Sequence, residues 1–170
     1  MMKMKRFKKY LAEARKKDTG FKLYVDMDGV LADFETAAKK AVGVDRIDRI
    51  DQQELWDAVE RRGPKFWENL KKLGDADELW RFVKPYNPTI LTSPSKSEWC
   101  IPGKKKWAKK HFGNVKVICE KKKAKYARPN TILIDDWNKQ TKRFEAAGGI
   151  GIIHKSAKAT IEELKRYGFE

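Results

Sequence analysis

Five short apolar segments, separated by longer segments with helical periodicity, constrain the fold of this chain more than any other feature. The apolar segments are residues 21–26, 89–92, 115–118, 131–134 and 150–153. Helical spacing of apolar side chains is found at about 33–42, 51–61, 64–72, 75–84, 102–112, 138–147 and 157–167. Short apolar strands that alternate with helices are typical of a parallel sheet covered on both faces. The sequence therefore predicts an α/β fold with a doubly wound, five-stranded parallel sheet.

Between the first two predicted strands the chain shows helical patterns and no convincing strand. We therefore expect a helical insertion at residues 33–80, with the sheet domain formed by 21–32 and 81–170. Ahead of both, residues 1–20 are expected to contain a basic amphipathic helix that ends at Asp18-Thr19-Gly20.

Length and composition exclude several classes of protein. The chain has 170 residues, enough for one domain with a sizeable core. It has no apolar stretch near the roughly 20 residues that cross a bilayer, and residues 1–20 lack the apolar core of a secretion signal. Its two cysteines, Cys100 and Cys119, lack the spacing of a metal site. We expect a cytoplasmic protein without a membrane partner.

The positive charge of the chain is concentrated in two segments. The net charge is +15, and residues 1–20 carry eight Lys and Arg against two acids. Residues 96–128 carry twelve Lys and Arg against two acids, so the remaining residues are close to neutral. Such basic segments suit an anionic substrate or a nucleic acid, although solvated lysine-rich faces have the same composition. The sequence leaves these alternatives open.

Polar side chains gather at the carboxyl ends of the predicted strands. They are Asp26, Asp28, Thr92, Ser93, Asp135 and Asp136, with Lys125 in the loop before the fourth strand. In a parallel sheet these ends lie at one edge, where ligands of open α/β sheets bind. Clustered carboxylates repel one another and need cations, and Mg²⁺ prefers oxygen ligands. Hydroxyls and an ammonium group beside such a metal would form a cradle for phosphate.

These motifs resemble the haloacid dehalogenase superfamily of phosphohydrolases, and within it the 5'(3')-deoxyribonucleotidases. The matching segments are Asp26-Met27-Asp28-Gly29-Val30-Leu31-Ala32-Asp33-Phe34, Phe66-Trp67-Glu68-Asn69-Leu70, Ile90-Leu91-Thr92-Ser93-Pro94, and Ile132-Leu133-Ile134-Asp135-Asp136, which Lys125 precedes by ten residues. The resemblance spans about residues 21–154. It implies a Mg²⁺-dependent phosphatase of nucleoside monophosphates, with residues 33–80 as a small cap over the site. Members of this group often form dimers, so a homodimer is one implied assembly.

The resemblance assigns a role to each motif residue. Asp26 would be the nucleophile that forms an aspartyl-phosphate, and Asp28 would act as general acid and base. Thr92 and Ser93 would hold phosphate oxygens, and Lys125 would balance the charge of the transferring phosphoryl group.

For the metal, the resemblance implies Asp136 as a direct ligand, with Asp135 acting beside it. Asp26 would contribute its carboxylate and Asp28 its backbone carbonyl. The nucleotide base would contact the aromatic residues of the cap, which are Phe34, Phe66 and Trp67.

The sequence departs from the family pattern at two places. Lys123-Ala124 stand where an Arg-Asp pair usually precedes the motif lysine, and Trp137 stands where an arginine usually follows the aspartate pair. Three functions therefore stay open: a phosphatase of mononucleotides, a phosphatase of polynucleotide ends, and a catalytically idle protein that binds nucleic acid. The basic segments at 1–20 and 96–128 favour a polynucleotide, whereas a small closing cap favours a mononucleotide.

Overall fold

The protein is built on one parallel sheet of five strands. The computed structural model describes residues 17–170, so the helix expected at 1–20 lies almost wholly outside the described residues. The strands are β1 (Lys22–Val25), β2 (Thr89–Thr92), β3 (Lys116–Cys119), β4 (Thr131–Asp135) and β5 (Ile150–Ile153). Their order is β3-β2-β1-β4-β5, and every pair is parallel. This confirms the predicted doubly wound sheet.

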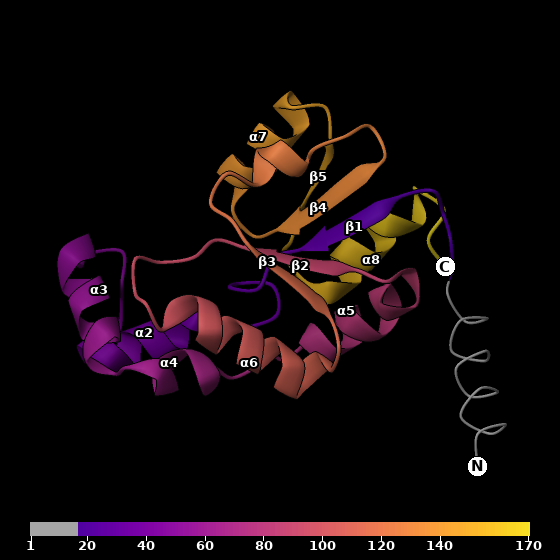
Figure 1. Cartoon of the computed structure of the whole chain (residues 1–170). Helices are drawn as coiled ribbons and strands as arrows, with labels where there is room; N and C mark the ends of the chain where they lie inside the picture. The colour runs from indigo at the N-terminus through magenta and orange to yellow at the C-terminus, as the bar shows by residue number, and fades with distance from the viewer. Residues whose placement is uncertain (1–16) are drawn as a thin grey trace, which may run out of the picture.

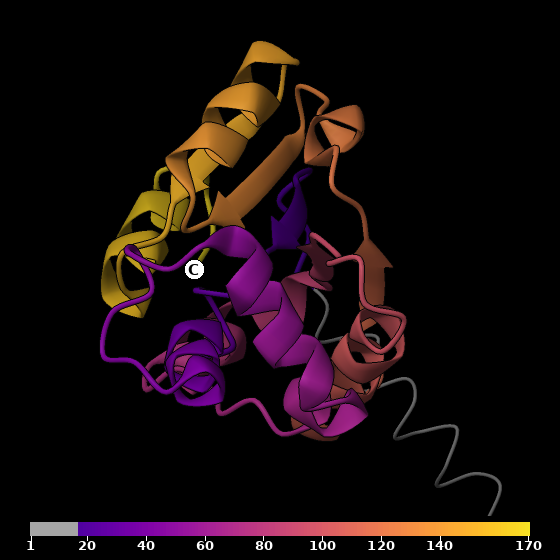
Figure 2. The same cartoon turned by 90° about the vertical axis from the view of Figure 1, so that its left-hand side faces the viewer.

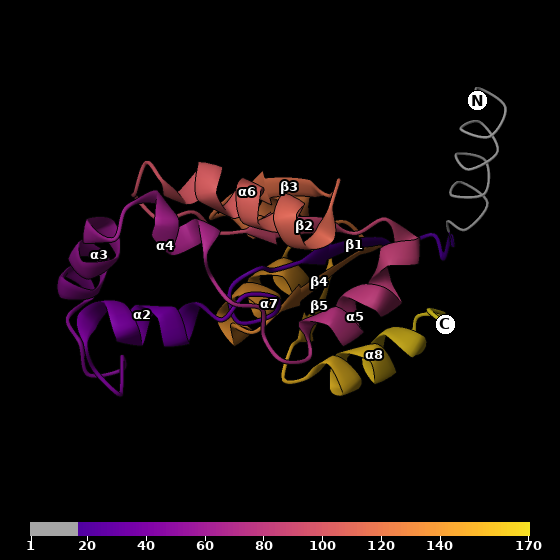
Figure 3. The ribbon, with the colours of Figure 1, turned by 90° about the horizontal axis from the view of Figure 1, so that it is seen from below.

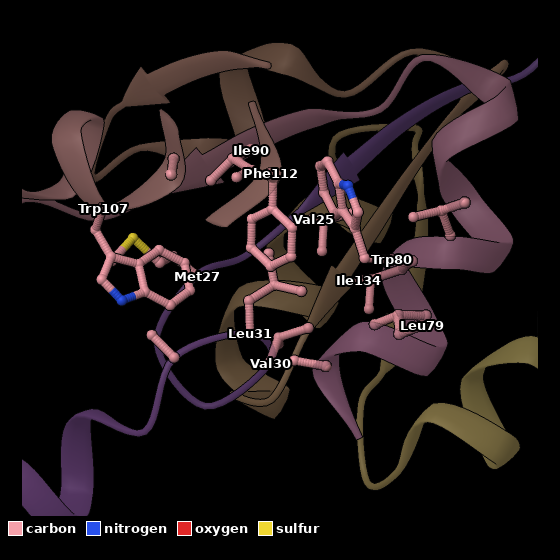
Figure 4. Close-up of a cluster of buried hydrophobic side chains, with 14 of the residues drawn as sticks. Val25, Met27, Val30, Leu31, Leu79, Trp80, Ile90, Trp107, Phe112 and Ile134 are labelled. Carbon is pink, nitrogen blue, oxygen red and sulfur yellow. The ribbon is translucent and has the colours of Figure 1, made fainter. Parts of the chain in front are cut away.

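Helices cover both faces of the sheet (Figure 1). One face packs against α5 (Ala76–Val83), α6 (Cys100–Phe112) and α8 (Ala157–Lys165), and the other against α7 (Asn138–Ala146). Successive strand residues therefore enter different cores: Leu23 and Val25 enter the larger one and Tyr24 the smaller. Figure 4 shows side chains of the larger core from β1, α5 and α6 in contact.

The helical insertion lies beyond the carboxyl ends of the strands. It consists of α2 (Phe34–Val42), α3 (Gln52–Arg61) and α4 (Pro64–Glu68), which stand at one end of the sheet in Figures 1 and 3. Helix α2 contacts α3, and α4 contacts α6. Helix α5 packs against α8 on the sheet, so the expected boundary at residue 81 falls inside a helix of the sheet layer. We call the unit formed by residues 33–69 the cap.

Helix α4 is shorter than the helix predicted at 64–72. Residues 71–73 are extended there and pair with the loop after β1. The Asp33 N–H donates to the Lys71 carbonyl at 2.8 Å, and the Leu73 N–H donates to the Leu31 carbonyl at 2.9 Å. The apolar spacing that suggested a longer helix instead buries Leu70 where the chain leaves α4.

The cap is attached to the sheet domain through close contact between α4 and α6. At Gly103 of α6, an added Cβ would lie 2.4 Å from the Cβ of Trp67, so only glycine allows this approach. The indole N–H of Trp107 donates to the Leu70 carbonyl at 2.7 Å. Within residues 17–170, no helix has the length and apolarity that a bilayer crossing requires.

Candidate active site

Three carboxylates meet where the strand order reverses. Strands β1 and β4 are neighbours at this point, and chain connections leave them in opposite directions across the sheet. Asp26 follows β1, Asp135 is the last residue of β4, and Asp136 comes next. Carboxylate oxygens of these three residues lie within 4.8 Å of one another. Ligands of open α/β sheets bind in the crevice at such a point.

A buried lysine neutralises part of this acidic cluster. The Lys123 ammonium lies 2.8 Å from Asp26 Oδ1 and 2.6 Å from Asp135 Oδ2. Its side chain is 1% exposed. Burial alone would lower the pKa of Lys123, but the two carboxylates outweigh it and raise the pKa. Lys123 therefore stays charged at the centre of the site.

The expected lysine, Lys125, is not in the site. Its ammonium pairs with Glu120, its side chain is 55% exposed, and it faces a separate surface hollow. The reason lies in the short 3₁₀-helix η2 (Lys123–Tyr126), which directs residue 123 inward and residue 125 outward. The assignment to Lys125 from its spacing is therefore corrected to Lys123.

A second buried lysine, which the sequence analysis missed, holds Asp28. The Lys104 ammonium on α6 lies 2.7 Å from Asp28 Oδ2 and donates to Thr92 Oγ1 and to the Ser93 carbonyl, both at 2.8 Å. Thr92 is fully buried behind Lys104 and does not line the cavity of the site. Thr92 therefore contacts Lys104 and helps to position it. It does not lie among the groups that face the cavity, where a phosphate was expected to meet it.

The loop after β1 brings Asp136 close to its backbone. Gly29 has a φ of +78°, and a Cβ there would lie 2.0 Å from Asp136 Oδ2. The loop is closed by the N–H groups of Leu31 and Ala32, which both donate to the Met27 carbonyl at 2.8 Å. Glycine is therefore required both for the turn and for the room that the carboxylate occupies.

Burial and mutual repulsion raise the pKa of several acids in the site. The pKa of Asp135 is raised to about 6 and that of Asp136 to about 7, in both cases by burial first and then by the charge of Asp26. The pKa of Asp28 is raised by burial, although Lys104 acts against this shift. Acids with raised pKa values at one edge of a sheet are typical of a functional site.

A cavity of about 1010 Å³ opens above these groups, between the sheet domain and the cap. Figure 2 looks at the molecule from the cap side, where the cap helices stand in front of the strand ends. Phe34 and Trp67 line the cavity with their rings stacked, 5.9 Å apart. Trp56 of α3 adds a third ring 5.8 Å from Phe34, a contribution that the sequence analysis missed. Phe66 does not line the cavity: it is buried against Phe34 and Trp67.

The sheet domain lines the cavity with polar groups. Ser93 lines it, and the Gln140 side chain lies 3.5 Å from Ser93 Oγ. Trp137, directly after the acidic pair, lines it too and is 54% exposed. Its backbone N–H donates to Asp135 Oδ1 at 2.9 Å, which holds this segment against the cluster.

Lys104 had a sequence signal that could have revealed it. It lies on the same helical face as Cys100, Trp107 and Ala108, which are all buried. A lysine on an apolar face indicates a buried cation with an acidic partner. Lys123 had no such signal, because the run of three lysines at 121–123 offers equivalent candidates.

Comparison with known proteins identifies the fold. No family model and no curated protein matches the sequence. A haloacid dehalogenase-like family hydrolase from Xanthomonas campestris superposes with a TM-score of 0.59 at 12% identity, over 87% of this chain and 92% of that one. A hydrolase from Streptococcus pneumoniae TIGR4 superposes with a TM-score of 0.57 at 12% identity, over 86% and 99%. The chain has the haloacid dehalogenase-like hydrolase fold.

A further structure of this fold contains ligands. It is a HAD family hydrolase from Deinococcus radiodurans R1 with bound phosphate and sodium, with a TM-score of 0.50 and 13% identity over 86% of this chain and 89% of that one. Identities this low establish the fold alone, so the function is argued from the site.

Proposed function

We propose that this protein is a Mg²⁺-dependent phosphatase that hydrolyses the phosphate monoester of nucleotides through an aspartyl-phosphate. The observation that carries the proposal is the position of Asp26, which lies at the switch point of the sheet beside Lys123 and two further carboxylates. The phosphate bound in the Deinococcus radiodurans hydrolase of the same fold is consistent with this reaction.

The two oxygens of Asp26 have different surroundings. Oδ1 accepts a hydrogen bond from the Met27 N–H at 2.8 Å and lies 2.8 Å from the Lys123 ammonium. Oδ2 accepts no hydrogen bond from the described residues. This leaves Oδ2 to attack phosphorus, forming an O–P bond while the bond between phosphorus and the nucleoside oxygen breaks. Lys123 offsets negative charge at the attacking carboxylate.

Asp28 supplies and recovers the proton. Burial raises its pKa, which makes its carboxylate a stronger base toward the proton that passes between water and the leaving oxygen. In the second step a water attacks the phosphorus, gives its proton to Asp28, and breaks the bond to Asp26 Oδ2. Lys104 holds Asp28 in position for both steps.

The carboxylates of Asp26, Asp135 and Asp136 suit a bound Mg²⁺. They offer oxygen ligands close together, and Gly29 leaves room for the Asp136 carboxylate. The Asp28 side chain is occupied by Lys104, so any contribution of Asp28 would come from its carbonyl. When bound, Mg²⁺ would offset the repulsion between these carboxylates and the phosphate.

The aromatic part of the cavity favours a nucleotide over a sugar phosphate. Phe34 and the 37% exposed Trp56 line the cavity on the cap side, and the buried Trp67 packs against Phe34. A nucleobase gains stacking energy against such rings, about 1–3 kcal/mol per base, whereas a sugar offers no aromatic face. The base is therefore assigned to the cap and the phosphate to the strand ends.

The test is phosphate release from nucleoside monophosphates and from hexose phosphates, with Mg²⁺ or with a chelator. We expect Mg²⁺-dependent release with a preference for nucleotides, and no turnover by Asp26→Asn. The Asp18→Asn variant is the matched control, because Asp18 lies in an exposed turn before β1, whereas Asp26 follows the other end of that strand. Undiminished turnover by Asp26→Asn would exclude the nucleophile, and an equal rate with hexose phosphates would exclude the nucleotide assignment.

A further inference from the structure

We infer that the site takes the phosphorylated end of a single-stranded nucleic acid, with the neighbouring nucleotide bound at an outer subsite formed by Trp137 and Lys121. This rests on the proposed function and extends it, because it names the substrate to which the nucleotide belongs.

The cavity is large for a site that holds one nucleotide. Pockets that hold ligands of drug size measure roughly 300–1,000 Å³. The cavity here, of about 1010 Å³, lies at the upper end of that range. The proposed base slot at Phe34, Trp56 and Trp67 and the carboxylate cluster account for only part of its lining. The remainder lies partly on the cap, along α3 and the loop before it, and partly on the sheet-domain side.

The sheet-domain side of the cavity contains an exposed aromatic ring. Trp137 is 54% exposed, the most exposed of the large apolar side chains that reach the surface in residues 17–170. It follows directly after Asp136, so a base stacked on it would belong to a nucleotide next to the reacting phosphate. The Lys139 ammonium lies 5.7 Å from the centre of the ring and adds a positive charge there. Aromatic rings beside positive charge are the usual platform for single-stranded nucleic acid.

Two lysines that line the cavity have no acidic partner among the described residues. Lys104 and Lys123 are committed to the carboxylates of the site by short ion pairs. Lys96 and Lys121 also line the cavity, and neither forms a salt bridge with a described residue. The reacting phosphate is assigned to the strand ends beside Asp26, so these lysines away from the carboxylate cluster suit additional phosphates of a strand.

The charge of the cap indicates where the strand would run. Asp57 and Glu60 of α3 line the cavity on the cap side and would repel a phosphate backbone. The basic residues lie on the sheet-domain side, in the loop after β2 and in the loop after β3. A strand would therefore leave along Trp137 and Lys121 instead of passing under α3, so the cap can cover the terminal base without closing on the strand.

The test compares thymidine monophosphate with short oligothymidylates that carry one phosphate, at the 3' end or at the 5' end. We expect kcat/KM to be at least about 5-fold higher for one of the two oligonucleotides, as one additional stacked base would give. Trp137→Ala should lower the ratio of oligonucleotide to mononucleotide kcat/KM by about 5- to 150-fold. Trp99→Ala is the matched control, because Trp99 is exposed to 38% but does not line the cavity.

The lysine is tested in the same way. Lys121→Met should lower the ratio of oligonucleotide to mononucleotide kcat/KM and weaken the dependence of this ratio on salt. Lys122 does not line the cavity, so Lys122→Met should change neither quantity. A second measurement uses fluorescence anisotropy of an oligonucleotide labelled at its unphosphorylated end. The Asp26→Asn protein should bind it more tightly than the Asp26→Asn/Trp137→Ala double variant.

The outcomes separate the two proposals. If no substrate releases phosphate, the proposed function falls, and the anisotropy measurement alone decides the outer subsite. If kcat/KM is the same for mononucleotides and oligonucleotides, the outer subsite is overturned while the phosphatase remains. The same holds if Trp137→Ala changes neither the ratio of oligonucleotide to mononucleotide kcat/KM nor the affinity for the labelled oligonucleotide. Preference for the 3' or the 5' oligonucleotide identifies the strand end.

Discussion

At the scale of single residues, the neutralisation of the carboxylates depends on which lysine reaches them. Lys123 and Lys125 are two residues apart, yet one is 1% exposed between Asp26 and Asp135 and the other is 55% exposed beside Glu120. A buried charge that loses its partner is strongly destabilised, whereas an exposed pair contributes little. The two lysines therefore provide a direct test of the site.

We expect Lys123→Met to lower phosphate release by on the order of 100-fold or more, the usual effect of removing one preorganised electrostatic contact to the reacting group. Lys125→Met should retain activity near that of the unmodified protein, because its ammonium lies outside the site. Steady-state kinetics with Mg²⁺ measure both, and circular dichroism checks that each variant is folded. A larger loss in Lys125→Met than in Lys123→Met would return the role to Lys125.

At the scale of secondary-structure elements, the junction between α4 and α6 sets the position of the cap. Trp67 lines the cavity and at the same time packs against Gly103, where a Cβ would come within 2.4 Å. Any side chain at Gly103 must therefore push Trp67, and with it the base slot, away from α6. The contact couples the stability of the domain to the shape of the proposed substrate site.

Gly103→Ala is expected to lower the free energy of unfolding by about 1–3 kcal/mol, the usual effect of overpacking, reduced somewhat by the better helix propensity of alanine. The KM for nucleotides should rise more than kcat falls, because the base slot moves and the carboxylates do not. Gly74→Ala is the control, since a Cβ there meets no atom within 4 Å. Chemical denaturation measures the free energy of unfolding of both variants, and steady-state kinetics measure their KM and kcat. Equal free energies of unfolding for the two variants would contradict the packing argument.

At the scale of the whole molecule, the acidic cluster makes stability depend on pH. The pKa of Asp135 is about 6 and that of Asp136 about 7 in the folded chain, above the ordinary value of 3.8. Between these values the folded state binds more protons than the unfolded state. Their contribution is therefore fully present below about pH 4 and is lost as the pH rises through the folded pKa values.

In metal-free buffer we expect Asp136→Asn to be more stable than the unmodified protein at pH 8, with the difference shrinking as the pH falls toward 4. The comparison of the two proteins cancels the opposite pH dependence of other acids, such as Glu68, whose pKa the Lys106 hydrogen bond lowers. Thermal denaturation across this pH range measures the difference. Added Mg²⁺ should raise the melting temperature of the unmodified protein more than that of Asp136→Asn, and a reversed order would count against the metal site.

The local pattern of the sequence was sufficient for the fold, because strands and helices leave periodic apolar signals and parallel strands bring their carboxyl ends to one edge. Asp26, Asp135 and Asp136 could be placed together for that reason, and so could Ser93, whereas Phe34 and Trp67 were expected at the site only from the family resemblance. Which lysines reach the carboxylates, that Thr92 lies behind Lys104, and that Phe66 is buried could not be read from the pattern. Those outcomes depend on how a 3₁₀ turn and two packed helices orient side chains, and contacts between residues distant in the chain set that orientation.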